Sequence, residues 1–231
     1  MSSPTTDASR QVRVWDPWIR LSHWLLAGAF FLAYFVVEEP LAVHVWAGYL
    51  IGALILIRIV WGLIGTRYAR FSDFVPTPGR LKRYLGDLVR GRERHYLGHN
   101  PAAGAMVVLL LVALTGTVVT GLMVYGAEEK AGPLAGWYAA APADPAAGPS
   151  LIPTARADEQ FGERGEAGEE DEGEHEEETL EEVHEFFANF TLFLVILHVG
   201  GVVFTSLRER QNLAGSMVTG CKRAPETEGP R

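Results

Sequence analysis

Four long apolar segments alternate with polar ones along this 231-residue chain. They span residues 18–37, 44–64, 102–125 and 186–207, and none of them contains a lysine or an acidic residue. A helix needs about 20 apolar residues to cross a hydrocarbon layer of about 30 Å, and each segment reaches roughly that length. The pattern therefore predicts an all-α integral membrane protein built as a bundle of four transmembrane helices.

Positive charge is concentrated between the second and third apolar segments and beside the two outermost ones. The positive-inside rule places such regions, and so both termini, on the cytoplasmic side. The expected organisation is a tail at residues 1–14, three helices with a basic cytoplasmic loop at 66–100 within residues 15–125, a periplasmic loop at 126–182, a fourth helix at 183–207 and a tail at 208–231. The predicted location is the bacterial cytoplasmic (inner) membrane, with several crossings.

The outer loop is acidic. Residues 158–182 carry fourteen acidic residues and one arginine, and the preceding part is rich in alanine, proline and glycine. Such a segment buries too little apolar surface to fold alone, so we expect it to be mobile. It could steer a basic periplasmic c-type cytochrome by charge, or act only as a solvating linker.

The inner loop contains a second amphipathic pattern. Apolar residues recur at helical spacing after two prolines, and charged residues lie between them (Leu81, Tyr84, Leu85, Leu88 and Val89). This pattern predicts a short helix in the headgroup region of the membrane.

Four histidines lie in or beside the apolar segments. His23 lies near the start of the first, His44 begins the second, and His184 and His198 are fourteen residues apart on the last. Fourteen helical residues cover about 21 Å and nearly four turns, so these two side chains point within about 40° of each other. Because successive helices alternate in direction, topology pairs His23 with His198 near the inner face and His44 with His184 near the outer face.

Two opposed imidazoles at each of two depths match the needs of heme b with two axial histidines. When both axial positions are filled, the expected work is one-electron transfer. Arg58 and Arg20 could pair with the propionates of the inner heme, although Arg20 could equally extend to lipid phosphates. The single cysteine, Cys221, excludes a disulfide or a covalently attached c-type heme within this chain.

Several short motifs resemble one known family in their order and spacing. They are the run from Val14 to Trp24, His44 to Gly48, Pro76 to Pro78, Gly98 to Ala105, and His198 with Gly201. Together they resemble the bacterial cytochrome b561 family, which includes the b-type cytochrome subunits of nickel-iron hydrogenases. The resemblance covers about residues 12–126 and 180–215 and leaves out the acidic loop.

This resemblance implies a four-helix protein with two heme b groups. Such a protein passes electrons between the quinone pool and a redox partner, as a free electron carrier or as a quinol-linked component of a hydrogenase or another respiratory complex. The implied iron ligands are the set reached from topology: His23, His44, His184 and His198. The direction of electron flow, the partner and the oligomeric state, a homodimer included, are left open. Lipid is an expected partner and nucleic acid is not.

Two other functions compete with electron transfer. A metal-ion transporter could use the same histidines, but no carboxylate lies in the apolar segments to balance a divalent ion. A membrane subunit without redox activity could simply anchor a partner.

The remaining histidines are weaker candidates for iron ligation. His99 belongs to the sequence Gly98-His-Asn-Pro101, where Asn100 can cap the third helix and Pro101 suits its first turn. This structural role explains His99 without a cofactor, and contact with a propionate or a quinone is the alternative. His95 and His175 are not expected to bind iron.

Overall fold

The computed structural model describes residues 11–36, 40–92, 96, 98–139 and 166–223, with side chains described for these residues except 139, 166–177 and 223. His95 lies outside these ranges, and the side chain of His175 is not described. The chain forms two compact units, one made of Met1–Thr115 with Phe190–Arg231 and the other of Gly116–Asn189. Each unit is considered by itself.

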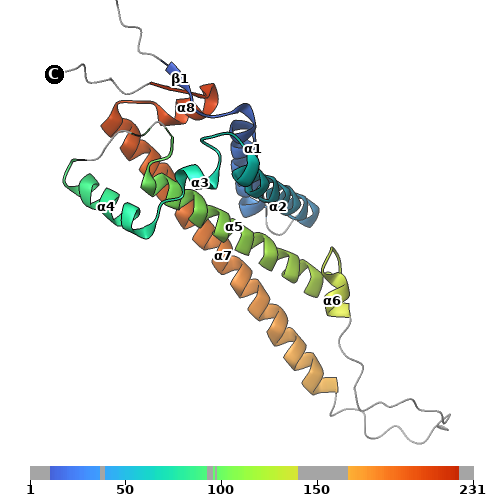
Figure 1. The fold of residues 1–231 in the computed structure, drawn as a ribbon. Helices are drawn as coiled ribbons and strands as arrows, with labels where there is room; N and C mark the ends of the chain where they lie inside the picture. Colours follow the sequence, from blue (N-terminus) through green and yellow to red (C-terminus); the bar gives the residue numbers. More distant parts are fainter. Residues whose placement is uncertain (1–10, 37–39, 93–95, 97, 140–165, 224–231) are drawn as a thin grey trace, which may run out of the picture. The chain divides into compact units, whose positions relative to one another are not determined.

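The described part of the chain is almost entirely helical (Figure 1). In chain order its elements are β1 (Gln11–Arg13), α1 (Pro17–Phe35), α2 (Leu41–Ile64), α3 (Phe71–Phe74), α4 (Pro78–Val89), α5 (Pro101–Ala127), α6 (Ala135–Ala139), α7 (Glu166–Glu209), α8 (Leu213–Thr219) and β2 (Cys221–Arg223).

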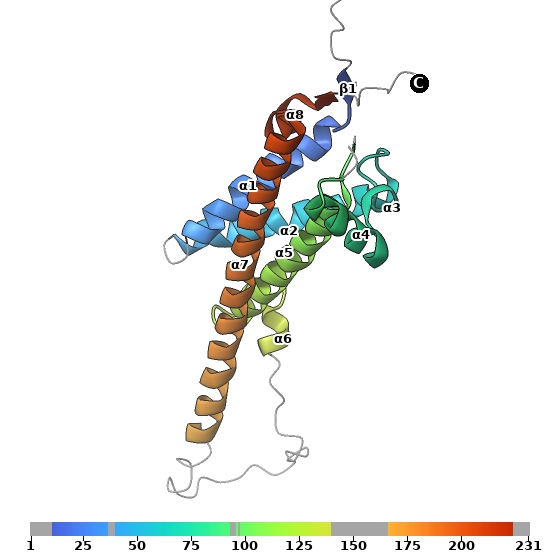
Figure 2. The same ribbon diagram turned by 90° about the vertical axis from the view of Figure 1, so that its left-hand side faces the viewer.

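Helices α1 and α2 pack along each other, as the blue and cyan ribbons show in Figures 1 and 2. Asp16 begins α1, because its carboxylate accepts the Ile19 amide at 2.9 Å and Pro17 occupies the first turn. The buried side chains on α1 include Ala29 and Phe30, and those on α2 include Ile51. Ala29 and the buried Ala47 leave room for close contact of the two helices.

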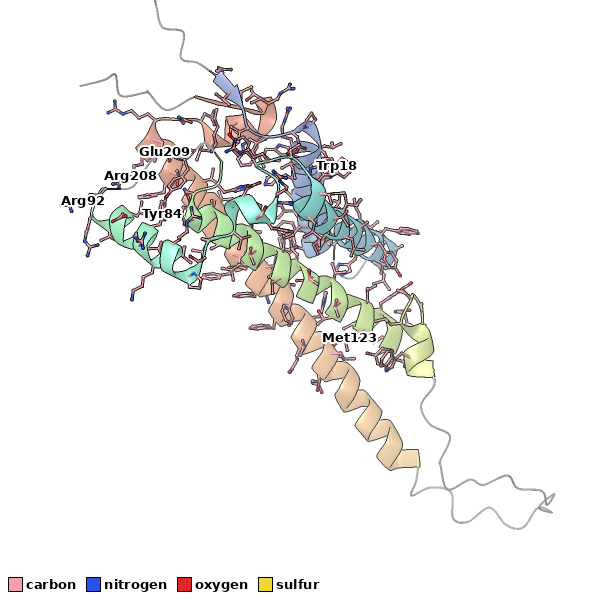
Figure 3. All side chains as sticks on the ribbon, in the orientation of Figure 1. Trp18, Tyr84, Arg92, Met123, Arg208 and Glu209 are labelled. Atoms are coloured by element: carbon pink, nitrogen blue, oxygen red, sulfur yellow. The ribbon has the colours of Figure 1, made fainter. Side chains whose placement is uncertain are left out.

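Helix α4 confirms the short helix that the inner loop predicts. Thr77 caps it by accepting the Arg80 amide at 3.4 Å, and Pro78 is its first residue. Tyr84, labelled in Figure 3, is buried, whereas Leu85 and Val89 are exposed. An exposed apolar surface beside basic residues is what a headgroup location requires, and that location stays a prediction.

The two ends of the chain meet in a short antiparallel ribbon that the sequence analysis did not anticipate. β1 pairs with β2 in the register Gln11↔Arg223, Val12↔Lys222 and Arg13↔Cys221. Helix α8, just before β2, is capped by Asn212 and is followed by Gly220, whose φ of 85° suits glycine. Because each strand has only three residues, no periodic pattern announces it in the sequence.

Helix α5 begins as predicted. The Asn100 side chain accepts the Ala103 amide at 2.8 Å and Pro101 is the first helical residue. Helix α7 begins at Glu166, well before the predicted fourth helix at 183–207. The predicted outer loop at 126–182 thus includes α6 and the first part of α7, and its location and mobility stay predictions.

Among the described residues, three helical segments are long and apolar enough to cross a membrane: Leu41–Ile64, Pro101–Ala127 and Glu178–Glu209. They correspond to the second, third and fourth predicted helices. Helix α1 is not among the three. It has 19 residues, and its first two turns contain Arg20 and His23.

Candidate functional site

His23 on α1 and His198 on α7 face each other within the first compact unit. Their ring centres are 6.3 Å apart and their planes are inclined by 54°. Both side chains are half-buried, and Nδ1 of His23 is buried without a hydrogen-bond partner. The structure therefore brings together the two residues of the predicted inner pair.

The distance between these rings fits one metal ion between them. An iron–nitrogen bond is about 2 Å long and the nitrogen lies about 1 Å from its ring centre, so two imidazoles on opposite sides of one iron have centres about 6 Å apart. The observed 6.3 Å agrees with this value. The residues present thus fit a bis-histidine heme.

His44 on α2 is oriented by the backbone of α1 and the residue that follows it. Its Nδ1 lies 2.9 Å from the carbonyl oxygen of Ala33 and 3.1 Å from that of Val36. A carbonyl can only accept, so Nδ1 must carry the proton and Nε2 the lone pair of the neutral ring. Metal-binding histidines are commonly oriented in this way, with the second nitrogen donating to a carbonyl.

His184 on α7 is held in a comparable way within the second unit. Its Nδ1 lies 3.1 Å from the hydroxyl of Thr120 on α5. That hydroxyl donates to the Gly116 carbonyl at 2.8 Å, which leaves its oxygen to accept from His184. If His184 binds iron, the ligating atom is therefore Nε2, as for His44.

Gly121 supports this arrangement by lacking a side chain. A Cβ at this position would lie 2.9 Å from Cε1 of His184 and 3.3 Å from its Nδ1. His44 and His184 belong to different units, so their pairing rests on the predicted topology alone.

Arg58 on α2 lies against two aromatic rings, with its Cζ 5.1 Å from the centre of Phe71 and 5.6 Å from that of Phe74. Its Nη1 is buried without a hydrogen-bond partner. No described carboxylate forms an ion pair with Arg58. A guanidinium in this position can accept a carboxylate from a bound group.

Arg20, the other predicted propionate partner, has backbone contacts instead. Its guanidinium donates to the carbonyl of Thr219 at 3.3 Å and also to that of Val218, at the end of α8. Arginines often bind the last carbonyls of a helix in this way. Arg20 thus fastens α8 to α1, and its propionate role stays a prediction.

Asp16 caps the start of α1, the helix that also carries Arg20. Its Oδ2 accepts hydrogen bonds from Thr66 at 2.6 Å and from Trp61 at 3.3 Å, in addition to the Ile19 amide on Oδ1. Burial raises the pKa of this carboxyl, but the hydrogen bonds together outweigh burial and hold the pKa below its usual value.

Sequence reasoning favoured a structural role for His99, with a propionate or quinone contact as the alternative, and it overlooked Lys222. The ring of His99 lies between Trp15 at 4.7 Å and Phe74 at 4.6 Å, and its Nδ1 is buried without a partner. Burial, and then the charges of Lys222, Arg58 and His198, lower the pKa of His99 to about 3. Its imidazole is therefore neutral near pH 7.

Lys222 on β2 is only 9% exposed. Its Nζ donates to the Gly98 carbonyl at 3.2 Å and lies 5.4 Å from the centre of the Trp15 ring. Burial lowers the pKa of this amine, and Glu209 at the end of α7 (Figure 3) opposes that shift. The only sequence signal for this region was the Gly98-His-Asn-Pro101 motif.

Comparison with known proteins gives one result. The family model described as prokaryotic cytochrome b561 matches residues 14–220. No curated protein and no solved structure matched the chain. The match covers all four predicted helices and most of the chain. The chain therefore belongs to the prokaryotic cytochrome b561 family and is a membrane b-type cytochrome of electron transfer.

Proposed function

We propose that this protein carries electrons across the membrane with two b-type hemes, an inner one on His23 and His198 and an outer one on His44 and His184. The observation that carries the proposal is the ring distance of 6.3 Å between His23 and His198. These residues are 175 positions apart in the chain, so no local pattern brings their rings together. Heme b, when bound, would supply reversible one-electron exchange at iron, and His23 and His198 are the residues that would hold the inner one.

The chain's own residues hold the ligands in a fixed orientation. Carbonyls of Ala33 and Val36 keep the Nδ1 proton on His44, and the Thr120 hydroxyl does the same for His184. In the neutral tautomer each Nε2 then carries the lone pair, and the contact at Nδ1 fixes the ring orientation, as is usual for metal-binding imidazoles. Arg58, unpaired among the described residues, would bind an inner propionate and neutralise its charge.

The proposed topology adds α1 to the three clear spans, which makes a four-helix bundle in the bacterial inner membrane. Support comes from the apolar length of residues 18–37 and from the basic residues of the 66–100 loop. Both termini then lie on the cytoplasmic side, consistent with the pairing of residues 11–13 with residues 221–223 in one ribbon. The outer heme faces the acidic loop.

The proposed substrate is the membrane quinone pool, and the second partner is a redox protein. The acidic segment at 158–182 suits a basic periplasmic c-type cytochrome, whose association would weaken with salt. The alternative is a role as the cytochrome b subunit of a hydrogenase or another respiratory complex, which would deliver electrons to quinone.

The test is the heme content of purified full-length protein and of single variants. Wild-type protein should contain two b-type hemes, and both His198→Ala and His184→Ala should each lose one of them. His175→Ala, a histidine outside the proposed set, is the matched control and should retain both. Two hemes with unchanged spectra in His198→Ala would refute the proposal, as would a colourless wild-type protein.

A further inference from the structure

Two buried side-chain nitrogens without hydrogen-bond partners belong to residues that lie against the same ring, Phe74, in the first unit. Phe74 is 4.6 Å from the ring of His99 and 5.6 Å from Cζ of Arg58, measured to its ring centre. Nδ1 of His99 and Nη1 of Arg58 are both buried and both lack a hydrogen-bond partner. Buried polar atoms without partners are rare in folded proteins, and each such atom requires an explanation.

The surroundings hold His99 in place from several sides. Trp15 packs on its ring at 4.7 Å, and the indole of Trp15 is itself fixed by a hydrogen bond to Ser216 at 3.3 Å. Asn100 caps α5 directly after His99, and Lys222 binds the carbonyl of Gly98 directly before it. The imidazole is thus fixed before any ligand binds, which favours precise recognition.

The described acidic groups do not satisfy these donors. Asp16, the carboxylate whose charge acts on Arg58, already binds Thr66, Trp61 and the Ile19 amide. Glu209 acts on Lys222. A bound group can supply an acceptor for His99 and Arg58, and two donors that share contact with Phe74 suit a carboxylate.

We propose that His99 is a positioning residue for the inner heme, donating from Nδ1 to the same propionate that binds Arg58. This inference rests on the proposed function, because His23 and His198 place that heme in the same unit. A neutral imidazole can donate from one nitrogen, so the bond needs no change of protonation.

A hydrogen bond donated to the propionate weakens the effect of the propionate's negative charge on the iron. A weaker negative charge near the iron favours the reduced heme. Removing the donor should make the inner heme harder to reduce. We expect about a tenfold fall in the ratio of reduced to oxidised inner heme at a fixed potential, equivalent to about 59 mV for one electron. The outer heme serves as an internal reference and should not change.

Two substitutions separate hydrogen bonding from packing. His99→Phe keeps an aromatic ring between Trp15 and Phe74 but removes the donor. His99→Asn is smaller but retains an amide N–H near the position of Nδ1. Redox titration with optical detection gives both heme potentials, and resonance Raman spectra report the propionate vibrations of each heme.

The expected result is a lowered inner potential and shifted propionate vibrations in His99→Phe, with values near wild type in His99→Asn. Unchanged potential and vibrations in His99→Phe would overturn the inference while leaving the two-heme proposal intact. Loss of the inner heme from both variants alike would make His99 a packing residue and overturn it too. Wild-type protein without heme would instead refute the proposed function itself.

Discussion

Replacement of Gly121 by alanine should disturb one proposed iron ligand and spare the other three. The added Cβ would lie 2.9 Å from Cε1 of His184 and 3.3 Å from Nδ1. Ordinary carbon contacts are about 3.5 to 4.0 Å, so the imidazole has to move by roughly half an ångström or more. The ring cannot move freely, because Thr120 holds its Nδ1 at 3.1 Å.

The expected size of the effect follows from the role of this hydrogen bond. Losing a contact that orients a metal-binding histidine typically weakens metal affinity by about 10 to 100-fold. This corresponds to about 1.4 to 2.8 kcal/mol of binding free energy. Gly121→Ala should therefore bind the outer heme more weakly by that factor and retain the inner heme on His23 and His198.

The assay is heme stoichiometry by pyridine hemochrome, combined with redox titration to distinguish the two hemes. Gly136→Ala is the matched control, since it lies in the same unit and a Cβ there would meet nothing within 4 Å. It should resemble wild type. Full occupancy and wild-type potentials for both hemes in Gly121→Ala would refute the reasoning, as would equal loss of both hemes.

Three further predictions concern the inner end of the first unit. Arg20→Gln removes donors to the end of α8, so residues 213–223 should exchange amide protons faster while the heme spectrum stays unchanged, and a changed spectrum would instead indicate a heme contact. The folded-state pKa of Asp16 lies below its usual value, so its stabilising contribution exists above about pH 4 and is lost as pH falls through the folded pKa. The melting temperature of wild type should accordingly fall more steeply below that pH than that of Asp16→Asn, and parallel curves would contradict this. Gly62→Ala places a Cβ 2.2 Å from Phe71, which should destabilise the protein by about 1 to 3 kcal/mol in thermal unfolding, whereas Gly28→Ala meets nothing within 4 Å and should not.

The sequence alone determined the membrane helices and several of their ends. Apolar runs of sufficient length, with at most one arginine, identify α2, α5 and the later part of α7, because a backbone in lipid must satisfy its hydrogen bonds within its own helix. Asp16, Thr77 and Asn100 mark helix starts, since capping is a contact between residues three apart. Such features depend only on neighbours in the chain.

The candidate site could be predicted only in part. Helix alternation and the fourteen-residue spacing were enough to pair His23 with His198, which the structure brings to 6.3 Å. The same reasoning left Arg20 between a propionate and lipid phosphates, and it did not anticipate the hydrogen bonds of Arg20 to α8, almost 200 positions away. Side-chain length and depth indicate what a residue can reach but not which of several acceptors it finds.

Only the tertiary structure decided which residues surround the proposed iron-binding histidines and that residues 11–13 pair with residues 221–223. Nothing near His184 in sequence indicates that Thr120 binds it, and nothing near His99 indicates its position between Trp15 and Phe74. The pairing of residues 11–13 with 221–223 is equally invisible in the local pattern. Local patterns report whether a segment prefers lipid or water, whereas these contacts depend on how separate helices rotate and pack against one another.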